Sequence, residues 1–448
     1  MVDYSVVSVL TGYAVVFIAC ASMSWPSPEI PALNSSTSQL DSELTTEEIS
    51  WIASFLGLGA IPGPFIFGFL ADHVGRKYSI LSLSVPLTLS YLLMLFTNKV
   101  IYLYIARFVV GTAVGGVFTV LPMYVGEMAL DRHRGILGNA MTTFLCLGLL
   151  FSYAVGPYLN FFDFNVMLAA LPAVFLVVFA VVGVESAHYY MAKNDRASAR
   201  AVLLKIRNVS DQEVEEELEN IRHLTDSERG GKLSDIFKSR GLARALFMTL
   251  GVMVFQQLAG IDPLTAYSEQ IFDEANTSIP AEICAIMIGL VQFVASFITP
   301  AVANRFGRKT LLIFSAVGMA VSEATLGLYF IFKNRSVDVS SVSFSPVLSL
   351  VAYYVFFNCG FGSIPFTIVG EIFPNNVKSS AAAVNTSLRW LVGFLMTRFF
   401  RNLVDLIEVG WVFELYGLMC VLAAFFIGFV VAETKGKSLK EIQDHLNN

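Results

Sequence analysis

Long apolar runs separated by short polar stretches make up most of the chain. One transmembrane helix needs about 20 predominantly apolar residues to cross about 30 Å of hydrocarbon. Most of the runs are too long for strands and lack a period of two, which argues against a β-barrel. Scanning for runs of sufficient length finds twelve, centred near Val15, Leu58, Pro86, Val114, Leu149, Phe175, Val254, Val291, Ala316, Tyr354, Val392 and Ala424. We therefore predict an all-α polytopic membrane protein with 12 transmembrane helices.

The composition agrees with this prediction and excludes several classes of protein. Hydrophobic residues make up 55% of the 448 positions and charged residues only 14%, against about 25% charged residues in an ordinary soluble domain. So little charge cannot cover the surface of a soluble protein of this size. The net charge of −6 comes without a basic patch that could follow phosphates. We expect the lipid bilayer as a partner and no nucleic acid.

The charges of the loops predict the orientation, because cytosolic loops are enriched in Lys and Arg. The stretch 25–50 after the first run has five acidic residues and no Lys or Arg. The loops after the second, fourth and eighth runs contain Arg76, Lys77, Arg132, Arg134, Arg305, Arg308 and Lys309. Even-numbered spans should therefore end in the cytosol, which places both termini there. Arg398 and Arg401, near the outer end of the eleventh run, depart from the rule without outweighing it.

Three Asn-X-Ser/Thr sequences fall in loops that this orientation places outside. They begin at Asn34, Asn276 and Asn334, which are candidate glycosylation sites. Because such sequences are common by chance, they support the orientation only weakly.

A charged stretch divides the runs into six and six. Residues 193–244 hold 21 of the 64 charged residues (29 Lys and Arg, 35 Asp and Glu). Val214, Leu218 and Ile221 have helical spacing there, which favours short amphipathic helices beneath the membrane over a solvated linker. We predict six-helix bundles at 1–187 and 241–432, a cytosolic helical linker at 188–240 and a short cytosolic tail at 433–448.

The two halves repeat a polar motif at corresponding places. Gly-Phe-Leu-Ala-Asp-His-Val-Gly-Arg-Lys at 68–77 follows the second run, and Pro-Ala-Val-Ala-Asn-Arg-Phe-Gly-Arg-Lys at 300–309 follows the eighth. Glu127 and Glu371 each precede a basic residue by seven positions, after the fourth and tenth runs. The repetition indicates two pseudo-symmetric bundles with a substrate site at their interface. Opposite charges at the inner helix ends favour ion pairs that latch the halves in an outward-open state; the alternative is ordinary positive-inside anchoring.

These motifs resemble the sugar porter family of the major facilitator superfamily over nearly the whole chain. The resemblance includes Arg107-Phe-Val-Val-Gly, Gln256-Gln-Leu-Ala-Gly, Ile364-Pro-Phe and Glu433-Thr-Lys-Gly-Lys-Ser-Leu. Trp25-Pro-Ser-Pro-Glu-Ile-Pro and Glu48-Ile-Ser-Trp are similar to the insect facilitated trehalose transporters within that family. The resemblance implies rocker-switch transport of a small sugar across the plasma membrane. It also implies a cytosolic gate of Asp72, Arg76, Glu127, Arg134, Glu185, Arg305, Arg308, Glu371, Lys378 and Glu433.

Uncharged polar residues in the runs are candidates for sugar binding. Amides both donate and accept, as sugar hydroxyls do, and such residues are costly in a bilayer unless they are used. Gln256, Gln257, Gln292 and Asn358 fit this description, although hydrogen bonds between helices are an alternative. Two adjacent side chains point about 100° apart, so one of Gln256 and Gln257 has an alternative packing role. The resemblance places all four at sugar-contacting positions, with Trp390 and Phe366 as aromatic walls and Tyr267 as an outer-gate residue.

Three departures from the family pattern predict an enlarged pocket. Phe366 replaces a tryptophan, Thr142 a glutamine and Asn358 a glutamate. The lost indole and amide free volume, which favours a substrate larger than glucose, such as the disaccharide trehalose.

Two charged residues replace amides inside the spans. Asp262 and Arg389 occupy positions where the family usually has asparagine, in the seventh and eleventh spans. An isolated charge at the bilayer centre costs about 2.5–3.5 kcal/mol. We consider two arrangements equally: a compensating pair beside the cavity, or two charges that face water separately.

The choice of transport mode rests on the first span. Residues 5–24 contain no Asp or Glu, whereas proton-coupled relatives carry a carboxylate there. Uniport of trehalose or a hexose such as glucose is therefore favoured over proton symport, and a non-transporting sugar sensor is a weaker alternative. No nucleophile–base pair, metal-ligand cluster or nucleotide loop is recognisable, so we expect neither an enzyme nor a cofactor. No obligatory protein partner is evident.

Overall fold

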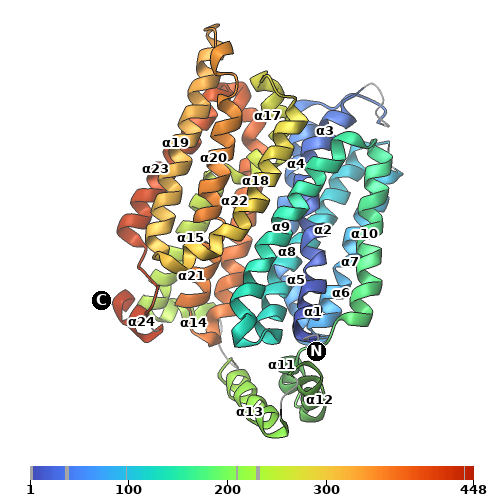
Figure 1. Cartoon of the computed structure of the whole chain (residues 1–448), viewed down its shortest axis with the longest axis vertical. Coiled ribbons are helices and arrows are strands. Elements are labelled where there is room, and N and C mark those ends of the chain that lie inside the picture. The colour runs from blue at the N-terminus through green and yellow to red at the C-terminus, as the bar shows by residue number, and fades with distance from the viewer. Residues whose placement is uncertain are drawn as a thin grey trace.

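A computed structural model describes residues 4–35, 40–96, 98–207, 210–228, 233–437 and 439–447. In these residues the chain forms α-helices, with two short 3-10 turns at Gly156–Tyr158 and Ser340–Val342. The helices run along one long axis and form two groups that lie beside each other (Figure 1).

The first group of helices comes from the N-terminal part of the chain. Its bounds are α1 Tyr4–Gly12, α2 Ala14–Ser24, α3 Pro26–Leu33, α4 Thr46–Ala60, α5 Gly63–His73, α6 Arg76–Ser82, α7 Ser84–Leu95, α8 Val100–Met128, α9 Asp131–Val155 and α10 Phe161–Val182. Four short helices follow, α11 Ala187–Ala192, α12 Arg196–Arg207, α13 Asp211–Glu228 and α14 Leu233–Lys238.

The second group comes from the C-terminal part of the chain. Its bounds are α15 Arg240–Leu258, α16 Ile261–Ala266, α17 Ser268–Ala275, α18 Ala281–Arg305, α19 Arg308–Asn334, α20 Ser345–Cys359, α21 Ile364–Ile372, α22 Asn375–Ile407, α23 Val409–Val430 and α24 Leu439–Asn447. Both ends of the chain lie toward the end of the molecule where α11–α14 lie, which we call the linker end (Figure 1). The opposite end, where α3 and α17 lie, is the far end.

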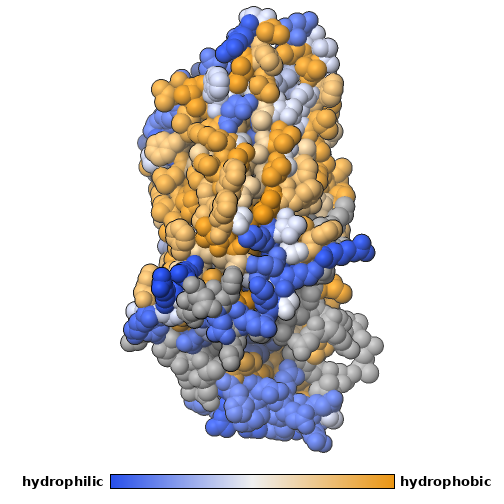
Figure 2. All heavy atoms as spheres, turned by 90° about the vertical axis from the view of Figure 1, so that its left-hand side faces the viewer, coloured by the Kyte–Doolittle hydropathy of each residue, from blue (hydrophilic) through white to orange (hydrophobic). Residues whose placement is uncertain are grey.

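The prediction of twelve spans is confirmed, since every predicted centre lies within a helix. Within the part of the chain that the structure describes, ten helical stretches are long and apolar enough to cross a membrane. The other two are α18, whose apolar stretch Ala281–Phe297 is shorter, and α22, whose 33 residues are interrupted by polar and charged side chains. The surface of the C-terminal group shows an apolar band between polar ends, as a bilayer-spanning protein requires (Figure 2).

Several spans are built from two helices in series, and the breaks follow the local sequence. Gly260 adopts a left-handed conformation with φ +79°, which ends α15 and turns the chain into α16. Pro365 stands at the start of α21, after the break that follows α20. Interrupted helices free backbone groups in the membrane, where they require partners or line a cavity.

The linker helices are amphipathic, as predicted. Val214, Leu218 and Ile221 lie on one face of α13, and their exposed fractions are between 0% and 3%. Beside this face, Arg196 and Arg200 of α12 pair with Glu215 of α13. The apolar spacing therefore forms a buried face rather than a solvated segment.

Candidate functional site

The break in the seventh span brings three of the predicted binding residues together. Gln256 and Gln257 stand in the last turn of α15, and Asp262 in the first turn of α16. The side-chain hydroxyl of Tyr353 donates to the carbonyl oxygen of Ala259 at 2.7 Å, which satisfies one of the groups freed by the break. The polar side chains are thus presented beside a point where the backbone is already irregular.

Arg389 of α22 joins these residues into one network. Its Nη2 lies 3.8 Å from Oδ1 of Asp262, and its Nε donates to Oε1 of Gln256 at 3.2 Å. When the amide of Gln257 is oriented to satisfy both neighbours, its nitrogen donates to Asp262 at 2.9 Å and its oxygen accepts from Arg389 at 3.1 Å. Of the two arrangements considered from sequence, Asp262 and Arg389 therefore form the compensating pair, with both glutamines as intermediaries.

The tenth span contributes a second break beside this network. The amide nitrogen of Gln256 donates to the carbonyl oxygen of Phe361 at 2.5 Å, within the irregular segment between α20 and α21. Asn358 donates to the carbonyl oxygen of Tyr354, one turn earlier in α20, at 2.9 Å. Phe366 is 37% exposed. Gln256 thus ties the two breaks together, a structural role beside the predicted binding role.

Three of the predicted residues have buried polar atoms that lack a partner. Among the described residues, Gln292 Nε2, Trp390 Nε1 and Tyr267 Oη make no hydrogen bond. Buried donors without partners are costly, and native proteins rarely keep them unless something else supplies the acceptor. Hydroxyl groups of a sugar can accept from all three.

A small cavity lies beside the ion pair, among spans 1, 2, 4, 7 and 11. Its lining includes Met23, Gly57, Arg107, Asp262, Trp390 and Phe394. Arg107 is 1% exposed and donates to the carbonyl oxygens of Ser22 at 2.7 Å and Ile52 at 3.1 Å. The sequence reasoning used Arg107 only as a family motif, although a charge inside an apolar span is itself the signal of a functional position.

Two further predicted residues lie around this region. Thr142 of α9 is partly buried, and the neighbouring Thr143 accepts a hydrogen bond from Ser296 of α18 at 3.2 Å. Tyr267 is fully buried and stacks on Phe400 of α22, with ring centres 5.2 Å apart. Its predicted role as an outer-gate residue stays a prediction.

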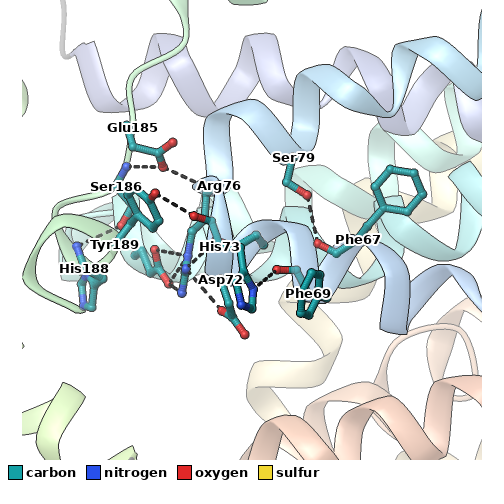
Figure 3. Close-up of polar contacts among 12 residues, drawn as sticks. Phe67, Phe69, Asp72, His73, Arg76, Ser79, Glu185, Ser186, His188 and Tyr189 are labelled. Carbon is teal, nitrogen blue, oxygen red and sulfur yellow. Dashed lines mark hydrogen bonds and ion pairs between the residues drawn. The ribbon is translucent and has the colours of Figure 1, made fainter. Parts of the chain in front are cut away.

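At the linker end of the N-terminal group, Arg76 holds two acidic residues (Figure 3). Its Nε and Nη2 bond both oxygens of Glu127 at 2.9–3.1 Å, and its Nη1 lies 3.4 Å from Asp72. Glu185 accepts from the backbone N–H groups of Arg76 and Lys77, the first residues of α6. Burial raises the pKa of Glu185 above its ordinary value, although hydrogen bonds from the backbone of Ser186, Lys77 and Arg76 oppose the rise.

The C-terminal group repeats this arrangement. Arg308 donates to Glu371 at 2.8 Å, and Glu433 accepts from the backbone N–H groups of Arg308 and Lys309 at the start of α19. Burial opposes ionisation of Glu433, but backbone hydrogen bonds from Lys435, Arg308, Lys309 and Thr434 outweigh it, and its pKa is lowered. A carboxylate at a helix N-terminus is favourable in both groups.

Both ion pairs join helices of the same group. The sequence interpretation, that these pairs latch the two groups to each other, stays a prediction. Arg305 is exposed, and Lys378 has no described ion pair. The side chain of Arg134 lies outside the described residues.

The three candidate glycosylation residues lie at the far end and are exposed. Asn34 follows α3, Asn276 follows α17 and Asn334 ends α19. The structure thus places them on one side of the apolar band, opposite the linker helices.

Comparison with known proteins identifies the family. The model of the family described as "Sugar (and other) transporter" matches residues 3–446. The chain belongs to this sugar transporter family. It is therefore a membrane transporter and not an enzyme.

Individual relatives agree with this assignment. The chain is 33% identical over 432 residues to a facilitated trehalose transporter Tret1 of Bombyx mori, covering 95% of this chain and 84% of that protein. It is 35% identical over 405 residues to Tret1 of Aedes aegypti, covering 90% of this chain and 50% of that protein. Among solved structures, the xylose transporter XylE from E. coli in a partially occluded inward-open conformation matches with a TM-score of 0.82 at 23% identity, covering 98% and 100% of the two chains. At this identity the likeness shows the major facilitator fold alone.

Proposed function

We propose that the protein is a facilitative transporter that carries trehalose, or a hexose such as glucose, down its concentration gradient by rocker-switch alternating access. The observation that carries the proposal is the polar network at the break of the seventh span. Donors and acceptors from Gln256, Gln257, Asp262 and Arg389 meet there in a buried position between the two groups of helices. The relatives described as facilitated trehalose transporters support the choice of sugar.

The proposed site combines hydrogen-bonding and aromatic residues. Hydroxyl groups of the sugar would accept hydrogen bonds from the unpartnered donors of Gln292, Trp390 and Tyr267. They would also compete with Arg389 for hydrogen bonds to the glutamine amides. Asn358, Phe366 and Thr142 complete the proposed site. Aromatic faces pack against the C–H surfaces of a sugar ring.

The transport mode is inferred from the groups that could carry a proton. The first span has no Asp or Glu at residues 5–24, and Asp262 is paired with Arg389. Glu323 of α19 is buried against Cys420 of α23, inside the C-terminal group. The first span therefore has no carboxyl group to carry a proton, and the carboxyl group of Asp262 is paired, so uniport is favoured. Proton symport is the alternative, and a non-transporting sensor is a weaker one.

The orientation and the gate follow from the same proposal. We place the linker end, with both termini, in the cytosol of cells that carry the protein in the plasma membrane. The linker-end charges would then form the cytosolic gate, and Asn34, Asn276 and Asn334 would carry glycans outside. The bundles would be 1–187 and 241–432, joined by the linker 188–240 and followed by the tail 433–448.

Counterflow in proteoliposomes tests the function. Vesicles loaded with unlabelled trehalose, glucose or fructose are expected to accumulate the matching labelled sugar transiently, with and without a pH gradient. Accumulation above the outside concentration without internal sugar, abolished by a protonophore, would replace uniport with symport. Folded protein that equilibrates no sugar would contradict the proposal.

A tryptophan at position 366 should reduce the size of the pocket. We expect Phe366→Trp to lower the ratio of disaccharide to hexose uptake several-fold, because the indole takes up volume that the larger sugar needs. Phe306→Trp, at an exposed position near the linker end of α18, is the matched control and should leave the ratio unchanged. An unchanged ratio in Phe366→Trp would refute the volume argument.

A further inference from the structure

The two groups of helices meet at the far end through α3 and α17 (Figure 1). The backbone N–H of Glu269, in α17, donates to the hydroxyl of Ser27, in α3, at 3.2 Å. On the same side, Tyr153 of α9 donates to the carbonyl oxygen of Thr265 in α16 at 2.8 Å. These contacts close the far end of the interface in this structure.

A buried carboxyl group lies on the N-terminal side of this contact. Glu29 is two residues after Ser27, and its exposed fraction is 0%. Its Oε2 accepts from the amide of Asn165 in α10 at a long 3.4 Å, and its Oε1 has no hydrogen-bond partner among the described residues. On this side Glu29 interacts electrostatically with Tyr91, whose hydroxyl bonds Ser22, while the donors of the buried Arg107 go to backbone carbonyls. Glu29 thus has no ion-pair partner among the described residues.

A second carboxyl group lies on the C-terminal side. Glu269 is partly buried, and its Oε2 is buried without a partner among the described residues. Its electrostatic neighbours are acidic, namely Asp273 on its own helix and Glu282 on α18. Three basic residues of this end are engaged elsewhere, since Arg401 pairs with Glu274, Arg398 pairs with Glu47, and Lys333 donates to the carbonyl oxygen of Glu274.

Two buried carboxyl groups on adjoining helices of one interface, each without a cation as partner among the described residues, cannot both stay ionised cheaply. Burial and like charge each disfavour the carboxylate, and a proton removes both penalties. We propose that Glu29 and Glu269 form a proton-binding site that fills when the far end closes and empties when α3 and α17 separate. The unpartnered Oε1 of Glu29 and Oε2 of Glu269 are the atoms that would hold the protons.

The direction of the pH effect follows from the closed geometry. Burial, and then the charge of Glu269, raise the pKa of Glu29 well above its ordinary value. Burial, Asp273 and Glu282 raise the pKa of Glu269 to about 7. A group with a raised pKa in the closed state stabilises that state at low pH, and the stabilisation is lost as the pH rises through the raised value. Acidification should therefore favour closure, and Glu269 contributes to this effect as the pH falls through about 7.

The site differs from a coupling site for symport. The two carboxyl groups lie at the far end, and when α3 and α17 separate they are exposed only to the solution on that side. Each proton returns to the solution from which it came, so the transport cycle moves no net proton. This inference rests on the proposed uniport and orientation, in which the far end faces outside.

Sugar uptake at different external pH values tests the inference. The internal pH is held constant and the sugar is supplied below the concentration that saturates transport. Lowering external pH from about 8 to about 5.5 should then slow uptake more than about tenfold. Addition of sugar should cause no proton flux. Uptake by the double variant Glu29→Gln/Glu269→Gln should not depend on external pH, while the control Glu43→Gln, an exposed far-end carboxyl, should behave as wild type. A pH response that persists in the double variant, or a proton flux coupled to sugar, would overturn the proposal.

A distance measurement separates this inference from the proposed function. Spin labels at Tyr158 and Ser278, both exposed at the far end of the two groups, would be attached through a bioorthogonal amino acid. Acidification should raise the population with a short label distance, relative to the population with a long one, more than about tenfold in wild type. It should leave this ratio of populations unchanged in the double variant. This result would support the proton site even if no sugar were transported, and an unchanged ratio in wild type would refute it even if transport were normal.

Discussion

Replacing Asp262 alone with asparagine is expected to reduce transport about a hundredfold. Arg389 would keep its charge in a buried position, and its remaining partners among the described residues would be Gln256, Gln257 and the face of Trp390. Removing one member of a buried ion pair costs about 3–5 kcal/mol, because the remaining charge is uncompensated. Arg389→Asn should be similarly damaging, since Asp262 would then be the uncompensated charge.

The double variant Asp262→Asn/Arg389→Asn should recover most of the lost transport. It places an amide at both positions, which removes both charges and keeps groups that can hydrogen-bond to the glutamines. Initial rates of sugar exchange in proteoliposomes, normalised to folded protein, would measure the recovery. Arg335→Asn, which removes an exposed positive charge at the far end, is the control. A double variant no better than the worse single variant would show that the two charges act independently.

Gly75→Ala is expected to destabilise the linker end by about 2–4 kcal/mol and to abolish most transport. Gly75 has φ +106° and ψ 161°, a region that is almost restricted to glycine and costs other residues about 1–3 kcal/mol. A Cβ there would also overlap Oε2 of Glu185, the carboxylate that caps α6. The side chain of Glu185 would have to leave the N-H groups of Arg76 and Lys77, and the ion pair of Arg76 with Glu127 would lose its support.

Gly126→Ala supplies a matched control on the same side of the molecule. A Cβ at Gly126, within α8, would meet no atom within 4 Å, and alanine is the better helix former by about 0.5–1 kcal/mol. Thermal unfolding in detergent should therefore show a lower melting temperature for Gly75→Ala and an equal or higher one for Gly126→Ala. Equal melting temperatures and transport rates for both variants would contradict the assigned role of the Glu185 contact.

Sequence reasoning was most successful where a local pattern fixes local structure. The twelve spans follow from the length of the apolar runs, and α13 follows from the spacing of Val214, Leu218 and Ile221. The repeated motif indicated two related halves, and in the structure Arg76 and Arg308 begin α6 and α19. These results depend on bilayer thickness and helical periodicity, which act within a few turns of the chain.

The partners of the polar residues could not be predicted in the same way. The pattern suggested sugar binding for the glutamines, with hydrogen bonds between helices or packing as alternatives. It did not indicate that both are engaged by Arg389 or that Gln256 supports the break in the tenth span. Glu29 attracted attention only as part of a family motif, because nothing near it in the sequence indicates that it will be fully buried beside the contact of α3 with α17. The position of Arg107 beside the cavity likewise could not be predicted from the sequence and is seen only in the tertiary structure.

The amino-acid sequence by itself determined that this chain crosses a membrane twelve times, in two related halves, with its charges concentrated at the helix ends and in the linker. Only the tertiary structure decided that Asp262 pairs with Arg389, that the ion pairs of Arg76 and Arg308 stay within their own halves, and that carboxyl oxygens of Glu29 and Glu269 are buried at the far end. The physical reason is one of range. Hydrophobicity and helix geometry are properties of consecutive residues, whereas ion pairing and the burial of a charge depend on which distant helices pack side by side.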